Sequence, residues 1–195
     1  GGADLGYGGI PNGIAVEFDT WTDAFLDDPY GAHLGVLTRG RAEMRPDHSN
    51  NLGATVNVPE FADGKPHRVK IVYEPEFHNE AAAHKSFQAA PYLARLMEPS
   101  GHGAGWGHGL GILKVYVDDM VDAALTVPTN LGAHLGLDSG RAFVGFTAST
   151  GEAFENHEVL SWQFEERQSE YLQESARMSA QPSAYGWDGY TPGRA

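Results

Sequence analysis

The chain has no cysteine, so neither a disulfide nor a thiolate metal site is available to it. Basic side chains are also scarce, because 13 lysines and arginines stand against 26 acidic residues and leave a formal net charge of −13. Such an excess of negative charge argues against nucleic acid or an anionic membrane surface as a partner. No apolar run approaches the length of a membrane-spanning helix, so we expect no membrane insertion.

An initiator methionine and a signal peptide are missing as well, since the chain opens at Gly1. We therefore expect it to be part of a longer gene product. Its 195 residues are enough for one sizeable core, such as that of a single all-β sandwich. The absence of cysteine leaves the compartment open, because a sandwich of this size does not depend on disulfides. We expect the extracellular space or the lumen of the endomembrane system.

The most informative feature that is present is a predicted strand leading into an acidic loop. Alternation along this strand places Glu17, Asp19 and Trp21 on one face and Val16 and Phe18 on the other. Neighbouring carboxylates repel each other, so a face that carries two of them needs water or a cation. The strand is therefore a candidate for metal binding.

The loop after this strand adds Asp23, Asp28 and His33. Carboxylate and carbonyl oxygens suit Ca²⁺, whereas a set that includes an imidazole suits Mn²⁺ or another transition ion. Taken one at a time, these residues are equally compatible with an ordinary solvated loop, because their spacing is not an established short motif. The residues alone leave both interpretations open.

Two long stretches resemble the L-type lectins, the legume-lectin and concanavalin A-like group. The first begins with Ile-Ala-Val-Glu-Phe-Asp-Thr-Trp at residues 14–21 and continues through the acidic loop, and the second, residues 143–164, resembles the family's closing strands. The opening loop, residues 5–12, is most similar to non-plant members. The resemblance, which covers about residues 1–75 and 110–166, implies an antiparallel all-β sandwich of the concanavalin A-like, jelly-roll type.

The resemblance also implies a site for two ions. The ligands implied for Mn²⁺, or another transition ion, are Glu17, Asp19, Asp28 and His33. The ligands implied for Ca²⁺ are Asp19, Asp23, Asp28 and the carbonyl of Trp21. Two shared carboxylates would then bridge the ions, which explains how so many acids can lie together.

A carbohydrate site beside the calcium is the third implication of the resemblance. Its expected residues are Gly2, Trp21, Asp23, Gly151, Glu152 and Ala153. Trp21 would stack on the apolar face of a sugar, with core packing as the alternative. The family usually has Asn at the position of Asp23, and that Asn donates amide hydrogens to a sugar hydroxyl. Asp23 keeps the oxygen and loses the donor.

Residues 1–166 are predicted to form one domain, with a partly helical insertion at 76–112 and a C-terminal extension at 167–195. The insertion indicates two short helices interrupted at Pro91, and its histidines lack the spacing of a known metal motif. We expect both added segments to contact other protein chains.

Within the domain, two strands are predicted over residues 53–75 and another over 113–119, whereas residues 34–52 are predicted to be a mobile connection or an edge strand. The side chains expected in the core near the end of the domain are Val144, Phe146, Ala148, Leu160, Trp162 and Phe164.

The function favoured by these observations is a non-catalytic, Ca/Mn-dependent carbohydrate-binding module. The alternative is a structural or assembly subunit that uses the sandwich as a scaffold. An enzyme is disfavoured, because related glucan hydrolases need a Glu-x-Asp-x-x-Glu run and Thr22 stands at its last position. The family places several strands before the glycine-rich loop, so the resemblance implies that this chain works within a larger protein or assembly.

Overall fold

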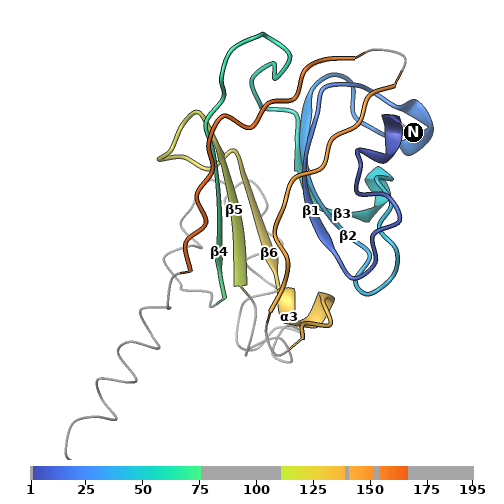
Figure 1. Ribbon diagram of the computed structural model, residues 1–195, viewed down its shortest axis with the longest axis vertical. Coiled ribbons are helices and arrows are strands. Elements are labelled where there is room, and N and C mark those ends of the chain that lie inside the picture. Colours follow the sequence, from blue (N-terminus) through green and yellow to red (C-terminus); the bar gives the residue numbers. More distant parts are fainter. Residues whose placement is uncertain (1, 76–110, 139–140, 152–153, 167–195) are drawn as a thin grey trace, which may run out of the picture. The chain divides into compact units, whose positions relative to one another are not determined.

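The computed structural model describes residues 2–75, 111–138, 141–151 and 154–166. Compact units span Gly1–Leu160 and Ser161–Ala195, and both sheets belong to the first unit (Figure 1). The predicted helices of the insertion and the whole C-terminal extension lie outside the described residues. Across the described ranges, no helix is both long and apolar enough to cross a bilayer.

The first sheet contains β1 (Ile14–Asp19), β2 (His33–Thr38) and β3 (Asn51–Thr55), antiparallel and in the order β1-β2-β3. The prediction of a mobile connection or edge strand after residue 33 was wrong, because β2 is the central strand and is buried along its whole length. Its first residues are apolar enough to be enclosed on both faces, and the exposed arginines of that segment follow only after the strand has ended.

The second sheet contains β4 (Val69–Glu74), β5 (Gly111–Val117) and β6 (Leu125–Thr129), again antiparallel and in sequence order. The predicted pairing of the strand that ends near residue 75 with the strand near 113–119 is confirmed. A short helix, α3 (Leu131–His134), follows β6, and the Asn130 side chain caps it by accepting from the Ala133 N–H.

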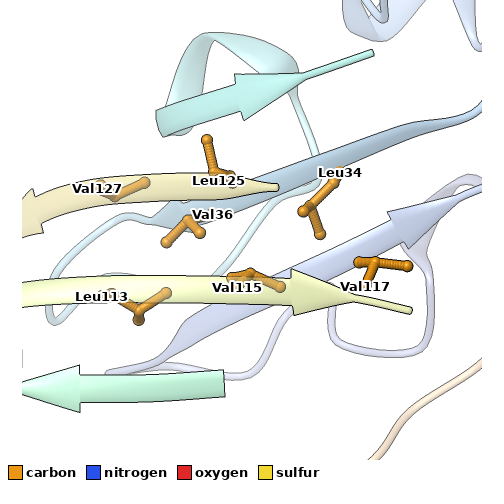
Figure 2. Close-up of a cluster of buried hydrophobic side chains, with 7 residues drawn as sticks. All are labelled: Leu34, Val36, Leu113, Val115, Val117, Leu125 and Val127. Carbon is orange, nitrogen blue, oxygen red and sulfur yellow. The ribbon is translucent and has the colours of Figure 1, made fainter. Parts of the chain in front are cut away.

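One apolar cluster joins the two sheets (Figure 2). It contains Leu34 and Val36 of β2, Leu113, Val115 and Val117 of β5, and Leu125 and Val127 of β6. At Gly53 of β3 an added Cβ would lie 2.8 Å from Cγ2 of Val127, so the absence of a side chain there lets β3 approach β6 closely. Two antiparallel sheets that share a core confirm the predicted all-β fold class.

The acidic residues of β1 lie on the face opposite this core. Its even-numbered side chains pack against the core: Ile14, Val16 and Phe18. Glu17 and Asp19 therefore point to the outer face, where Tyr7 from the opening loop packs with Leu37 and Met44 in a second apolar cluster. Beneath this cover only 5% of Glu17 and 7% of Asp19 remain exposed, so the two carboxylates are not solvated.

The predicted core positions after residue 143 are exposed instead. The exposed fractions are 58% for Val144, 62% for Phe146, 72% for Leu160, 54% for Trp162 and 64% for Phe164, and Ala148 is exposed too. In the described part of the chain, residues 143–164 form no strand, so their alternating side chains are not sorted onto the two faces of a sheet. Side-chain hydrogen bonds hold the segment to the opening loop, from Thr147 Oγ1 to Leu5 O (2.9 Å) and from Ser149 Oγ to Gly2 O (2.6 Å).

Candidate metal and carbohydrate site

The ladder between β1 and β2 brings the predicted transition-ion ligands together. Asp19 lies directly opposite His33, and Glu17 lies opposite Gly35. Ligand atoms of Glu17, Asp19 and His33 are all within 4.8 Å of one another, and all three residues are buried. Asp28, from the loop between the strands, forms an overlapping group with His33. The structure thus gathers the three predicted carboxylate ligands around the imidazole of the fourth, His33.

One nitrogen of the His33 ring makes a hydrogen bond, and the other makes none among the described residues. Nδ1 lies 3.3 Å from the carbonyl oxygen of Gly31, which only accepts, so Nδ1 carries the proton. Nε2 lies 3.5 Å from Glu17 Oε1 and 3.9 Å from Asp28 Oδ1, and among the described residues it has no hydrogen-bond partner. A fully buried, unpaired nitrogen is unfavourable, and a cation between it and the carboxylates would satisfy it. The donor set therefore fits a transition ion.

Burial also changes the acidity of the cluster. Desolvation raises the pKa of Asp19 from 3.8 to about 6, and the neighbouring Glu17 carboxylate adds to the rise while a backbone N–H opposes it. Desolvation raises the pKa of Asp28 as well. For His33, burial lowers the pKa, but the Glu17 carboxylate and the other nearby acceptors outweigh it, so the pKa lies above its ordinary value. Without an ion, the cluster holds protons more tightly than exposed side chains would.

Backbone N–H groups of the acidic loop donate to two of these carboxylates and hold the loop against them. The N–H of Trp21 donates to Asp19 Oδ1 at 2.8 Å, and the N–H of Asp23 donates to Asp28 Oδ2 at 3.0 Å. The Asp23 carboxylate belongs to neither cluster within 4.8 Å, and the Trp21 side chain is 54% exposed. Both remain predicted calcium and sugar residues on a loop whose path the carboxylates fix.

Two expected sugar-site segments, far apart in sequence, meet beside this loop. A Cβ added to Gly2 would lie 2.5 Å from the Cα of Gly151, so the two glycine backbones are in contact. Thr20, at the start of the loop, donates from Oγ1 to Glu155 Oε1 at 2.7 Å. Two other predicted residues of the sugar site fall outside the described part of the chain: Glu152 and Ala153.

An open depression of about 510 Å³ runs along the same segment. Its polar lining includes Ser149, Thr150, Asn156 and His157, together with Glu155, which contacts the acidic loop. Hydroxyl, amide and carboxylate groups supply both donors and acceptors, as recognition of sugar hydroxyls requires. The depression therefore places polar groups of both kinds next to the loop.

Comparison with known proteins adds a finding from the second half of the chain. Residues 109–179 match the family model of the legume lectin domain. This stretch is similar to the legume lectin domain. The matched segment includes β5, β6 and the exposed residues 143–164, whereas the clustered ligands lie before it. No solved structure matches the chain. The family match and the geometry of the ligands are therefore independent observations.

Sequence reasoning missed two residues of the outer face, Tyr7 and His48. Tyr7 lies within the opening loop that resembles the family, but its hydroxyl acquires a role only when that loop covers Glu17. His48 lies in a segment that was predicted to be a connection, and the antiparallel pairing of β3 with β2 brings it toward His33. No sequence signal distinguishes either from ordinary packing or surface residues.

The Tyr7 hydroxyl donates to Glu17 Oε2 at 2.5 Å. Burial is the largest cause that raises the pKa of Tyr7, and this hydrogen bond raises it further. We expect Tyr7→Phe to keep the ring packing against Leu37 and Met44 but to free the Glu17 carboxylate. Metal affinity should fall about tenfold, as is usual when the partner of a ligand is removed. Calorimetric titration with Ca²⁺ and with a transition ion measures this.

Tyr73→Phe is the matched control for this substitution. The Tyr73 hydroxyl bonds to the backbone of Thr129 and Leu131 in the second sheet, away from the ligands. Its loss should reduce stability without changing metal affinity. Wild-type metal affinity in Tyr7→Phe would contradict a positioning role for Tyr7.

Proposed function

We propose that the chain is a non-catalytic carbohydrate-binding module whose sugar site depends on Ca²⁺ and a transition ion. A legume lectin domain is a carbohydrate-binding domain, and residues 109–179 match it. The dependence on metal is supported chiefly by the buried, unpaired Nε2 of His33, which faces the carboxylates of Glu17 and Asp28. Legume lectin domains are generally non-catalytic, and the missing second glutamate at Thr22 supports the same conclusion for this chain.

In this proposal the ion ligands, the acidic loop and the polar depression have different roles in sugar binding. Bound ions would supply positive charge that offsets the repulsion among the carboxylates. The loop held by Asp19 and Asp28 would then present Trp21 to the apolar face of a sugar. Thr20 and its hydrogen bond to Glu155 tie the loop to the polar depression, whose side chains would bind the hydroxyls.

A glycan array probed with and without a chelator tests this proposal. We expect binding in the presence of Ca²⁺ and a transition ion, at least a tenfold loss in EDTA, and recovery when the ions return. Asp23→Asn should strengthen binding about fivefold, because it restores an amide donor worth about 1 kcal/mol. Asp27→Asn makes the same change of charge at an exposed position of the loop and should have no effect. Absence of any glycan binding with both ions present would contradict the proposal.

The second candidate is an assembly subunit, favoured by the exposed apolar side chains of residues 143–160. In this alternative the insertion at 76–112 and the extension at 167–195 remain the proposed contact surfaces. The same array separates the two functions. A chain that binds no glycan in either metal state, and whose mass in solution rises with concentration, would favour assembly.

A further inference from the structure

The outer face of the first sheet carries an imidazole that the predicted ligand set does not include. His48 belongs to the short helical turn η3 (His48–Asn50), which leads directly into β3. Ligand atoms of His48, His33 and Asp28 lie within 4.8 Å of one another. The rings of His48 and His33 have centroids 5.7 Å apart and meet edge to face. His33 is therefore flanked by carboxylates on the β1 side and by a second imidazole on the β3 side.

These separations are close to those of residues that share one ion. Nitrogen and oxygen ligands bind Zn²⁺ at about 2.1 Å, so two of them on one ion are at most about 4.2 Å apart. The ligand atoms of Asp28, His33 and His48 already lie within 4.8 Å of one another, so each pair needs to approach by less than about 1 Å to satisfy this limit. With each ring centroid roughly 3.2 Å from a shared ion, two rings can be up to about 6.4 Å apart, and the observed 5.7 Å lies inside that limit.

The neighbour of His48 suits it to the role of a ligand. The side-chain amide nitrogen of Asn51 lies 3.0 Å from His48 Nδ1, and Asn51 Oδ1 is buried with no hydrogen-bond partner among the described residues. A half-turn of the amide exchanges the two atoms and lets Oδ1 accept a hydrogen bond from the Nδ1–H of His48. This leaves the Nε2 lone pair of His48 for an ion, and an outer acceptor of this kind accompanies most histidine ligands. The absent side chain at Gly35 makes room for Asn51, since a Cβ there would lie 2.6 Å from Oδ1.

We propose that His48 is a ligand of the transition ion, held by Asn51, and that this second imidazole shifts the site from Mn²⁺ toward Zn²⁺ and Co²⁺. The inference rests on the metal site of the proposed function and adds a residue and an ion preference to it. Imidazole suits Zn²⁺ and its neighbours, whereas Mn²⁺ binds most weakly among the divalent ions of this series and accepts oxygen ligands readily. Loss of the second imidazole should therefore weaken Zn²⁺ and Co²⁺ binding more than Mn²⁺ binding.

The test titrates the metal-free full chain, in the presence of Ca²⁺, with Zn²⁺, Co²⁺ or Mn²⁺ alone. We expect His48→Gln to weaken Zn²⁺ and Co²⁺ binding by about 10–100-fold and Mn²⁺ binding by less than about threefold. The visible absorption of bound Co²⁺ should also change, because a nitrogen donor is lost. His134→Gln, at a partly exposed position of α3, is the matched control and should leave the titrations unchanged.

Asn51→Asp guards against a variant that merely misfolds. A carboxylate accepting from His48 Nδ1 should raise Zn²⁺ affinity above that of the wild type, a gain that misfolding would not produce. His33→Ala distinguishes a failure of the His48 inference from a failure of the metal site in the proposed function. If His33→Ala abolishes Zn²⁺ binding while His48→Gln keeps wild-type affinity and Co²⁺ absorption, His48 is not a ligand and only this inference falls. If His33→Ala also binds Zn²⁺ as the wild type does, the metal site of the proposed function fails as well.

Discussion

Chelation of the metal-loaded protein is expected to lower its melting temperature by roughly 10 °C. An ion present at 100–1,000 times its dissociation constant stabilises the folded state by about 3–4 kcal/mol, and each kcal/mol shifts the melting temperature of a domain of this size by about 2–4 °C. The effect follows from the burial of Glu17, Asp19, Asp28 and His33 in one cluster, where the ion replaces the water that exposed side chains would have. Differential scanning calorimetry before chelation, in EDTA and after return of the ions measures it.

Two variants make the measurement specific. His33→Ala should lose most of the response to EDTA, because it removes the imidazole that both ligand groups share. Asp63→Asn alters an exposed carboxylate that hydrogen-bonds to Lys65, far along the chain, and should keep the full response. A wild-type melting temperature that is the same with and without EDTA would mean that the cluster binds no ion tightly.

Asp19→Asn is expected to have opposite effects on the metal-free and metal-loaded proteins. Burial raises the pKa of Asp19 from 3.8 to about 6, so the folded metal-free protein binds this proton more tightly than the unfolded chain. The stabilisation is complete below about pH 3.8 and is lost as pH rises through about 6, on the order of 2–3 kcal/mol by pH 7.5. Asparagine carries no charge to desolvate and can still accept from the Trp21 N–H, so it avoids this loss.

Unfolding by urea, with the metal-free proteins at pH 5 and pH 7.5, measures the difference between Asp19→Asn and the wild type. The variant should gain on the wild type as pH rises, while its response to added ions should nearly vanish. Both proteins share the titrating groups outside the cluster, so the change in the difference reports on Asp19 and the groups beside it. A difference that is equal at the two pH values would show that the Asp19 carboxylate is not desolvated.

The first sheet shows how far local sequence can determine a site. Alternation along β1 correctly separated Glu17 and Asp19 from Val16 and Phe18, because side-chain direction in a strand depends only on the pleat. The same pattern did not reveal that the acidic face is the buried one. That outcome depends on Tyr7 and its loop, which cover the sheet from outside and are brought there by tertiary packing.

Residues 143–164 failed as a core prediction for a different reason. Their alternation is strand-like, but a strand also needs hydrogen-bonded neighbours and a facing layer, which sequence patterns do not supply. His48 and Asn51 were missed for a related reason. Each is an ordinary polar residue in sequence, and only the pairing of β3 with β2 places them beside His33. Contacts and burial that depend on a partner strand cannot be predicted from the pattern of a single segment.

The site on the β1–β2 ladder and the core between the sheets differ in how far apart in sequence their contacting residues lie. The site is built from a hairpin, its loop and the next strand, so the chain segments that must close to assemble it are short, and short loops close at low entropic cost. The core between the sheets instead joins β2 to β5 and β6, across a long intervening stretch of chain. The ligand cluster thus lies in the region of low contact order, and the slow, non-local pairings that limit the folding rates of β-sandwiches lie elsewhere.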